Sequence, residues 1–104
     1  MNTYKNVNVN KLANIYFEGK VISRKITFSD NTIKTLGVML PGEYEFKTQS
    51  KEVMEIISGE LNLQLEGDTN WNTIKDGMSF DVSKDSTFKV KVFKIVNYCC
   101  SYFD

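Results

Sequence analysis

The sequence predicts a single domain that is built entirely of β-strands. Its 104 residues suit one domain with one modest core. No window shows helical periodicity over three turns, and the chain consists instead of short runs in which apolar and polar residues alternate, with turn residues between them. About nine or ten strands in such a chain form a sandwich or a small barrel, and the number of strands alone does not choose between them.

The strands of the first half follow a polar, Asn-rich beginning. Residues 1–12 are expected to be flexible or to pair with a sheet edge, and residues 13–104 to form the folded barrel. Turn residues such as Gly19 and Asp30 separate the runs that follow. Strands are expected at residues 15–17, 21–28, 33–40 and 42–48.

Two cationic residues share the parity of apolar neighbours in these strands. Arg24 has the parity of Ile22, and Lys34 has the parity of Leu36. We therefore expect both cationic side chains to face the interior. Gly37, in the middle of a strand, predicts a bulge or a close approach of another group to the backbone.

The second half repeats the pattern and ends in a run that is apolar on both faces. Strands are expected at residues 52–58 and 61–65, with a turn at Gly59 and Glu60 between them. A short strand is expected to start at Trp71 and to end before Asp76, and further strands at 80–82, 88–92 and 95–103. A strand that is apolar on both faces is typical of sheet packing or of an interface. Three residues of the last run lie on one side of it, namely Tyr98, Cys100 and Tyr102.

Composition excludes several classes of function. The formal net charge is zero, with 13 basic and 13 acidic residues, so no basic stripe indicates binding to nucleic acid. The chain has no histidine, which excludes zinc triads, His-based dyads and the facial triad of non-haem iron, so no transition-metal site is expected. A Mg²⁺ site made of carboxylates stays open from composition. No apolar signal sequence or membrane-spanning run is present, so neither export nor a membrane partner is expected.

The two cysteines, Cys99 and Cys100, are adjacent. On a strand they point to opposite faces, so we expect no internal disulfide. Free thiols and the lack of an export signal favour the cytoplasm. A thiol-based enzyme is disfavoured, because no histidine or helix N-terminus is available to lower the pKa of either thiol.

The spacing around Glu52 resembles the first motif of cupin barrels. Cupins place a metal-ligand Glu, then six residues, then a Gly, and Glu52 and Gly59 have this spacing. The preceding pair of histidine ligands is replaced here by Phe46 and Thr48. The positions of the second cupin motif hold Gly77, Ser83, Asp85 and Phe88, the last in place of a histidine. The resemblance implies an RmlC-like jelly-roll barrel that keeps the motif frame and lacks three of its four metal ligands.

Five separated blocks, at residues 23–24, 34–39, 41–48, 77–80 and 98–102, agree in order and spacing with one family. They resemble the small cupin-like pyrimidine/purine nucleoside phosphorylases of bacteria, from about Ile15 to Phe103. The chain departs from that family at residues 82–85, where members usually have Val-Pro and a turn of small residues. It also has Val53 where some relatives carry a second acidic residue.

The resemblance implies metal-free phosphorolysis. A purine or pyrimidine nucleoside and inorganic phosphate would give the free base and α-D-ribose 1-phosphate, with broad tolerance for the base. It also implies a homodimer without a cofactor.

Phosphorolysis needs cations for phosphate, an acceptor for the ribose hydroxyls and the developing positive charge, and a surface that holds the base. Arg24 is expected to bind phosphate and take part in catalysis, with Lys34 assisting, because a guanidinium matches phosphate oxygens. Glu52 is expected to be catalytic, as the acceptor that stabilises the cation-like ribose. The structural alternatives are Arg24 at the barrel rim and an ion pair between Glu52 and either cation.

The base is expected to contact aromatic side chains on the same face. Tyr44, Phe46 and Phe88 share the cavity parity and can stack on any base, and Thr48 is a candidate hydrogen-bond partner. The alternative for each aromatic residue is ordinary core packing.

One other function stays open from the sequence. A cupin that has lost its ligands can be a non-catalytic module that binds a small molecule, with a regulatory or structural role. Release of free base from uridine or adenosine only when phosphate is present distinguishes the two. A metal-dependent cupin isomerase or dioxygenase conflicts with the missing histidines.

Overall fold

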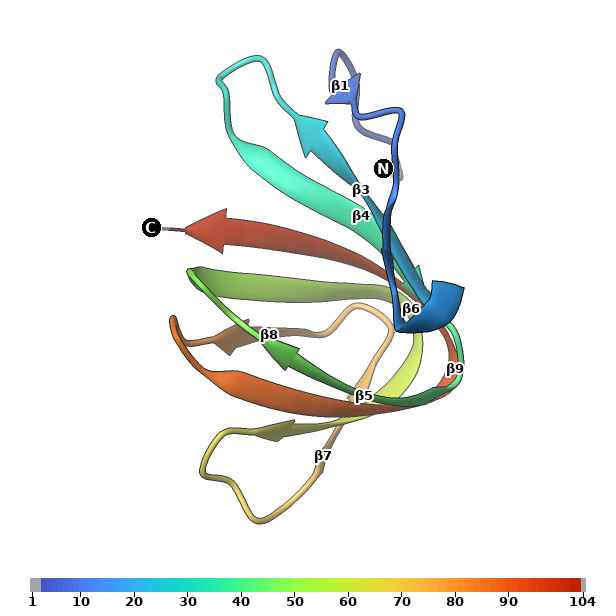
Figure 1. Cartoon of the computed structure of the whole chain (residues 1–104), viewed down its shortest axis with the longest axis vertical. Coiled ribbons are helices and arrows are strands. Elements are labelled where there is room, and N and C mark those ends of the chain that lie inside the picture. The colour runs from blue at the N-terminus through green and yellow to red at the C-terminus, as the bar shows by residue number, and fades with distance from the viewer. Residues whose placement is uncertain (1–2, 104) are drawn as a thin grey trace.

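A computed structural model describes residues 3–103, which form nine strands and one short 3₁₀ helix, and it confirms the all-β prediction (Figure 1). The expected segments 1–12 and 13–104 include residues 1, 2 and 104, which lie outside the described part of the chain. The elements in chain order are β1 (Asn8–Val9), β2 (Asn14–Tyr16), η1 (Phe17–Gly19), β3 (Val21–Thr27), β4 (Ile33–Met39), β5 (Gly42–Lys47), β6 (Lys51–Leu65), β7 (Asn72–Lys75), β8 (Ser79–Val82) and β9 (Thr87–Phe103).

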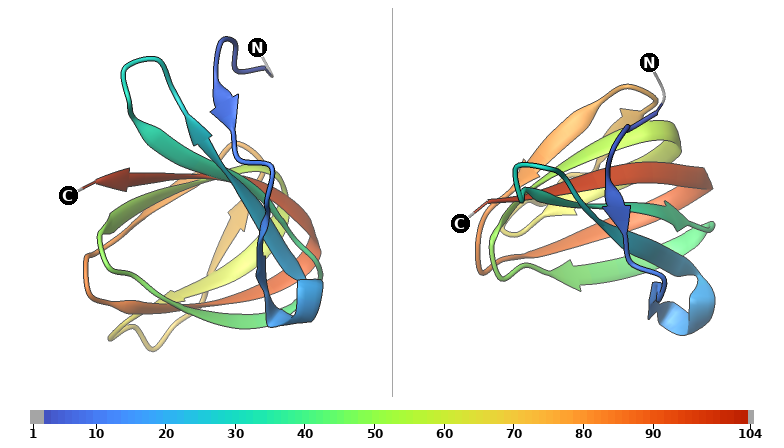
Figure 2. Two further views of the ribbon diagram at one scale, coloured as in Figure 1. Left: turned by 45° about the horizontal axis from the view of Figure 1, so that its top comes forward. Right: turned by 90° about the horizontal axis from the view of Figure 1, so that it is seen from above.

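Two long strands, β6 and β9, organise the fold because each takes part in two layers. The first half of β6 pairs with the second half of β9, and this layer continues through β4 to β3 on one side and to β8 on the other. The second half of β6 pairs with the first half of β9, flanked by β7 and β5. β1 and β2 pair with the free edge of β3. The strands thus wrap around a common centre as a jelly-roll barrel (Figure 2).

The chain bends at Gly59 without turning, which corrects the expected turn there. β6 runs through Gly59 with shifts of register against β9 between Ile56 and Leu61. Gly59 has a φ of +107°, and a Cβ at this position would lie 2.4 Å from the carbonyl oxygen of Ile95. The Asp76 carboxylate accepts a hydrogen bond from the Gly59 N–H at 2.7 Å. A bulge of this kind re-aims a strand, and it carries β6 from one layer into the other.

The inward and outward faces of β3 are the reverse of those expected. Ser23 is buried and Arg24 is exposed, and on β4 the inward residues include the buried Thr35. The apolar residues that alternate with these inward residues, such as Ile22 of β3 and Leu36 of β4, lie on the outer face of the sheet. That face is apolar because the N-terminal segment covers part of it, where the Tyr4 hydroxyl lies 3.5 Å from Cys99 Sγ. The expectation that Arg24 and its neighbours by parity face the interior is therefore wrong.

The core fills the space between the two layers. Its side chains come from both long strands and from β3, β4, β5, β7 and β8. Met39, Ile56, Leu61, Val90 and Val96 are among those with 1% exposure or less. A core that draws on strands from both layers fixes their relative position and with it the walls of the space between them.

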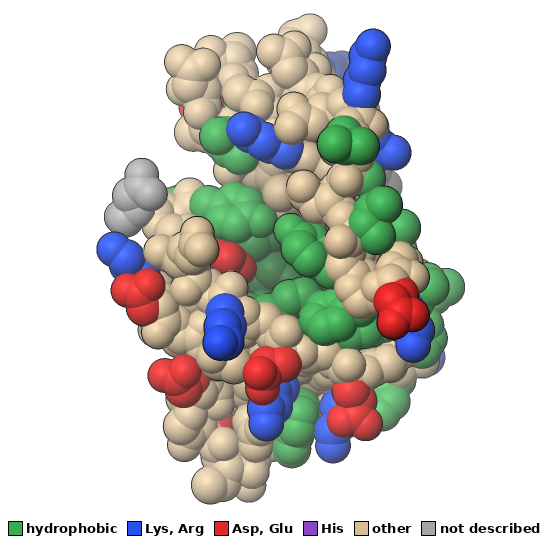
Figure 3. All heavy atoms as spheres, viewed as in Figure 1, with side chains coloured by type: hydrophobic (Ala, Val, Ile, Leu, Met, Phe, Trp, Pro, Cys, Tyr) green, Lys and Arg blue, Asp and Glu red, His purple; other side chains and the backbone are tan. Residues whose placement is uncertain are grey.

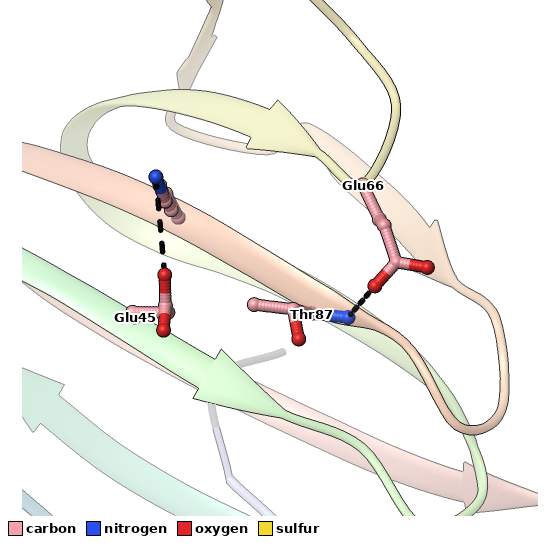
Figure 4. A network of polar contacts seen from close by, with 4 residues as sticks. Glu45, Glu66 and Thr87 are labelled. Atoms are coloured by element: carbon pink, nitrogen blue, oxygen red, sulfur yellow. Dashed lines mark hydrogen bonds and ion pairs between the residues drawn. The ribbon is translucent and has the colours of Figure 1, made fainter.

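Polar side chains make contacts on the outer surface of the second layer, where β5 pairs with β9. Glu45 of β5 faces Lys89 of β9, with 3.9 Å between Oε1 and Nζ (Figure 4). Glu66 accepts a hydrogen bond from the backbone N–H of Thr87 at 3.0 Å. Glu45 and Lys89 are both about half exposed, so their ion pair contributes little to stability.

Candidate functional site

A cavity of about 150 Å³ lies between the two layers and opens to solvent. Figure 3 shows a hollow in the surface that is lined by hydrophobic side chains, with an acidic side chain next to them. Its apolar wall includes Met39 of β4 and Met54 of β6, which are almost fully buried. Strands from both layers supply the remaining wall, so the cavity depends on the whole barrel.

Glu52 of β6 is the acidic residue on the cavity wall among residues 3–103. Its backbone lies between Val82 of β8 and Tyr102 of β9. The Cys100 thiol donates a hydrogen bond to Oε1 at 3.5 Å. Burial raises the pKa of the Glu52 carboxyl, and the hydrogen bond from the thiol offsets part of that rise. Within the described residues, no ion pair involves this carboxyl.

The wall beside Glu52 is made of neutral hydrogen-bonding groups from the second half of β9. The Tyr102 hydroxyl lies 3.0 Å from the Thr35 hydroxyl. Burial raises the pKa of Tyr98 to about 12, against a smaller opposite effect of its hydrogen bond with Ser23. Burial also raises the pKa of the Tyr102 phenol and of the Cys100 thiol, so both keep their protons near neutral pH. Cys100 therefore acts as a hydrogen-bond donor and is not poised as a nucleophile.

An aromatic row forms the opposite wall. Phe46 of β5 stacks on Phe88 of β9, with 5.2 Å between ring centroids and 27° between ring planes. Phe17 of η1 meets the Phe46 ring edge-on at 5.5 Å, and Tyr16 at the end of β2 completes the rim. The positive φ values of Phe17 and Glu18, 52° and 57°, mark the tight turn that follows Tyr16 and brings the Phe17 ring against Phe46.

The structure brings three of the expected site residues to the cavity: Glu52, Phe46 and Phe88. The two expected phosphate ligands lie elsewhere. The Arg24 guanidinium is exposed on the outer face and donates a hydrogen bond to the carbonyl of Lys11. The Lys34 ammonium lies over the rings of Tyr4 and Phe28, 5.8 and 5.6 Å from their centroids.

Tyr44 and Thr48 do point inward, and they have local partners away from the cavity wall. The Tyr44 hydroxyl donates to the carbonyl of Leu40 at 2.6 Å, at the turn between β4 and β5. The Thr48 hydroxyl donates to the carbonyl of Ser83 at 2.6 Å and accepts the backbone N–H of Ser86 at 3.0 Å. Both side chains tie loops to the barrel, and their expected contact with substrate does not follow from this placement.

Several cavity residues were not singled out from the sequence. Lys47, the last residue of β5, is the basic residue on the cavity wall in the part of the chain described. In the sequence pattern, Lys47 has the same parity as Glu43 and Glu45, which were expected to face solvent. Because Lys47 is the last residue of β5, its side chain reaches the opening of the cavity. The reversed faces of β3 hid Ser23 from the sequence pattern, and the run of three apolar or aromatic residues at 15–17 gave no face for Tyr16 of β2. The rest of the cavity wall includes Tyr98, Cys100 and Tyr102 of β9. The sequence placed these three residues on one side of a strand, and this pattern could have identified them as site residues.

The described residues contain no group of three or more Cys, Asp or Glu side chains arranged to hold a metal ion. They also contain no helix long and apolar enough to cross a membrane. The polar side-chain groups on the cavity wall are one carboxyl, one ammonium, one thiol and several hydroxyl groups. This set can bind and orient a polar ligand and can hold a proton at the carboxyl.

Comparisons with known proteins agree with the family resemblance of the sequence. The profile of a family described as pyrimidine/purine nucleoside phosphorylase matches residues 11–102. A relative from Chlorobium chlorochromatii, named pyrimidine/purine nucleoside phosphorylase, is 54% identical over 102 residues, 98% of each chain. A crystal structure of a protein of unknown function from Acinetobacter sp. ADP1 superposes with a TM-score of 0.95 at 38% identity, covering 97% of this chain and 98% of that one.

A more distant solved structure addresses the fold. An RmlC-like cupin from Shewanella frigidimarina superposes with a TM-score of 0.70 at 13% identity, covering 96% of this chain and 86% of that one. At such low identity the likeness shows the fold alone. It confirms the prediction of an RmlC-like cupin barrel.

Proposed function

The chain belongs to the pyrimidine/purine nucleoside phosphorylase family, and on this premise we propose that it cleaves purine and pyrimidine nucleosides with inorganic phosphate. The products are the free base and α-D-ribose 1-phosphate, and the reaction uses no metal or other cofactor. Phosphate attacks C1′ of the ribose as the base departs, through a state that carries positive charge on the sugar. Most of the acceleration comes from positioning and from electrostatic stabilisation.

The observation that carries this proposal is an acidic and a basic residue on the wall of one aromatic cavity, Glu52 and Lys47. An apolar cavity of about 150 Å³ holds a benzene ring, so the volume suits the ring system of a base. The ribose and the phosphate then extend into the open mouth. Contact with the faces or edges of Phe46 and Phe88 holds any base without reading its polar edge, which supports broad specificity.

A panel of nucleosides tests this function directly. Uridine, adenosine, inosine and guanosine are incubated with the protein, with and without phosphate and with a chelator, and free base and ribose 1-phosphate are measured. We expect equal amounts of both products, only when phosphate is present and with the chelator added. Release of base without phosphate would indicate a hydrolase, and binding without turnover would indicate the non-catalytic small-molecule cupin.

Lys47 replaces Arg24 and Lys34 as the proposed phosphate ligand. It lies on the cavity wall, and neither of the other two cations does. An ammonium is a compact charge that suits phosphate oxygens, and its exposed stem can follow the substrate. The backbone of Lys47 pairs with Thr87, so its position at the rim is fixed by the β5–β9 ladder.

Replacement of Lys47 by methionine is expected to raise the KM for phosphate by roughly 10- to 100-fold, because a hydrogen bond to a charged group contributes about 1.5–3 kcal/mol. The KM for nucleoside should change little. Initial rates measured across phosphate concentrations give both constants. Lys89→Met, on the solvent face of the neighbouring strand, is the matched control and should leave both unchanged. A normal phosphate KM in Lys47→Met together with a raised one in Arg24→Ala would return the role to Arg24.

We also propose that the protein acts as a homodimer. The outer face of the layer formed by β3, β4 and the adjoining halves of β6 and β9 exposes apolar side chains, among them Ile22 at 39%, Ile57 at 48% and Ile95 at 53%. An apolar patch of this kind on a sheet is typical of a surface that binds protein. A second copy of the chain is the occupant we propose.

Ile95→Glu is expected to shift the protein to monomer, because an acidic side chain in an apolar interface loses its hydration without a partner. Light scattering coupled to size exclusion reads the mass over a range of protein concentrations. Asn72→Glu, on the exposed strand β7 of the other layer, is the control and should keep the dimer. A wild-type mass of one chain at all concentrations would rule out the homodimer.

A further inference from the structure

We propose that Glu52 is the general acid that protonates the departing base, an inference that rests on the proposed phosphorolysis. The base leaves the sugar with the electron pair of the glycosidic bond. Without a proton it leaves as an anion, which is a poor leaving group for most nucleosides. A positioned acid that supplies this proton accelerates such a step by about 10²–10⁴-fold.

The position of Glu52 fits this role. Its carboxyl lies on the wall of the base-sized cavity, across from the aromatic residues proposed to contact the base. The backbone ladder holds it rigidly, since β6 is paired on both sides at this point. An acid here meets the ring system of the substrate, whereas the rim, with Lys47, meets the sugar and the phosphate.

Burial favours the neutral form of Glu52 and outweighs the opposite effect of the hydrogen bond from the Cys100 thiol. Lys47 is the basic residue on the same cavity wall among the described residues. From β9 the neighbours are Cys100, Tyr98 and Tyr102, all of which keep their protons near neutral pH. On the adjoining strands the charged residues pair with each other outside, as Lys51 does with Asp81 at 4.0 Å. Within residues 3–103 no cation lies within ion-pair distance of Glu52, and its burial favours the uncharged carboxyl.

The step balances in atoms and charge. The C1′–N bond breaks and its electron pair goes to the base, which takes the proton of the Glu52 carboxyl at a ring nitrogen or carbonyl oxygen. A phosphate oxygen forms the new bond to C1′. The phosphate brings a proton of its own, and the carboxylate regains that proton from the new ester, directly or through water. A single proton donor serves bases of different shape, in keeping with broad specificity.

Guanosine and 7-methylguanosine form a matched pair of substrates for the test. The methylated base already carries positive charge on its ring, so it departs neutral without taking up a proton. We expect Glu52→Gln to lose about 10²–10⁴-fold in kcat/KM on guanosine and less than about tenfold on 7-methylguanosine. Turnover of 7-methylguanosine by the variant also shows that it is folded and binds phosphate.

The pH profile provides a second readout. With a required neutral acid, kcat/KM of the wild type on uridine falls as the pH rises through the pKa of Glu52, and Glu52→Gln lacks that limb. Equal losses on both guanosines, or a wild-type rate that falls as the pH is lowered through this pKa, would overturn the acid role and assign a carboxylate that stabilises the sugar cation. Absence of phosphorolysis of any nucleoside by the wild type would instead reject the proposed function itself.

Discussion

Replacing Gly37 by alanine is expected to lower the free energy of unfolding by about 2–4 kcal/mol and to abolish most nucleoside cleavage. A Cβ at this position would lie 2.6 Å from Cζ and from the hydroxyl of Tyr98, and 2.7 Å from the carbonyl oxygen of Ile22. Real Cβ atoms do not approach other groups so closely, so the Tyr98 ring must move. That ring forms part of the cavity wall, and its displacement would change the space proposed to hold the base.

Urea denaturation and kcat/KM on uridine measure the two effects. In the double variant Gly37→Ala with Tyr98→Leu, removal of the ring should restore part of the stability, and the two changes should therefore be non-additive. Gly67→Ala is the reference: nothing lies within 4 Å of its added Cβ, but its φ of +87° strains any residue with a side chain, so its loss of stability reports backbone strain without a steric clash and should leave activity unchanged. If Gly37→Ala is as stable and as active as the wild type, the close packing of Tyr98 over β4 is not maintained in solution.

Raising the pH from about 9 to 12 is expected to destabilise the fold strongly. The ordinary pKa of Tyr98 is 10.0, and burial raises it to about 12 in the folded protein. Between these values the unfolded chain releases the phenolic proton and the folded chain keeps it. Deprotonation then stabilises the unfolded state, so stability is full below pH 9 and falls as the pH rises towards 12. Two pKa units correspond to about 3 kcal/mol from this group alone.

The buried groups next to Tyr98 add to the same loss, since burial also raises the pKa of Tyr102 and Cys100. Thermal unfolding at pH 7, 9, 10 and 11 measures the trend. Tyr98→Phe should show a smaller loss between pH 9 and 11, while its stability at pH 7 reports only the missing hydrogen bond with Ser23. An alkaline loss of the same size in Tyr98→Phe would show that other groups cause it.

The fold and one part of the site followed from the sequence because spacing fixes register. The distance from Phe46 through Glu52 to Gly59 matches a barrel motif, and strands aligned by that motif place Phe46, Glu52 and Phe88 on the cavity. A turn and a bulge at Gly59 could not be told apart, since a glycine with positive φ serves both. Only the pairing with Ile95 and Val96 distinguishes them.

The faces of β3 and the side of β9 that lines the cavity could not be read from alternation. Alternation assigns the apolar side to the core, and here Ser23 and Thr35 face inward while Leu36 faces the outer side. Such reversal is expected where a site needs hydroxyl groups and a second surface covers the other face. On β9 both faces are apolar. The alternation therefore showed that Tyr98 and Cys100 lie on the same face of the strand, but not whether that face lines the cavity or the outer surface.

The sharing of β6 and β9 between the two layers has a consequence for how the molecule opens. Neither layer can detach as a separate unit, because each contains half of both strands. Backbone amides that pair β6 with β9 on either side of the bulge at Gly59 should therefore exchange hydrogen with solvent only when the whole domain unfolds. Faster exchange is expected in the short strands β1, β2, β7 and β8 at the margins and at the bulge itself. A ligand of the proposed kind would then reach the cavity through its open mouth, beside Tyr16, without separation of the two layers.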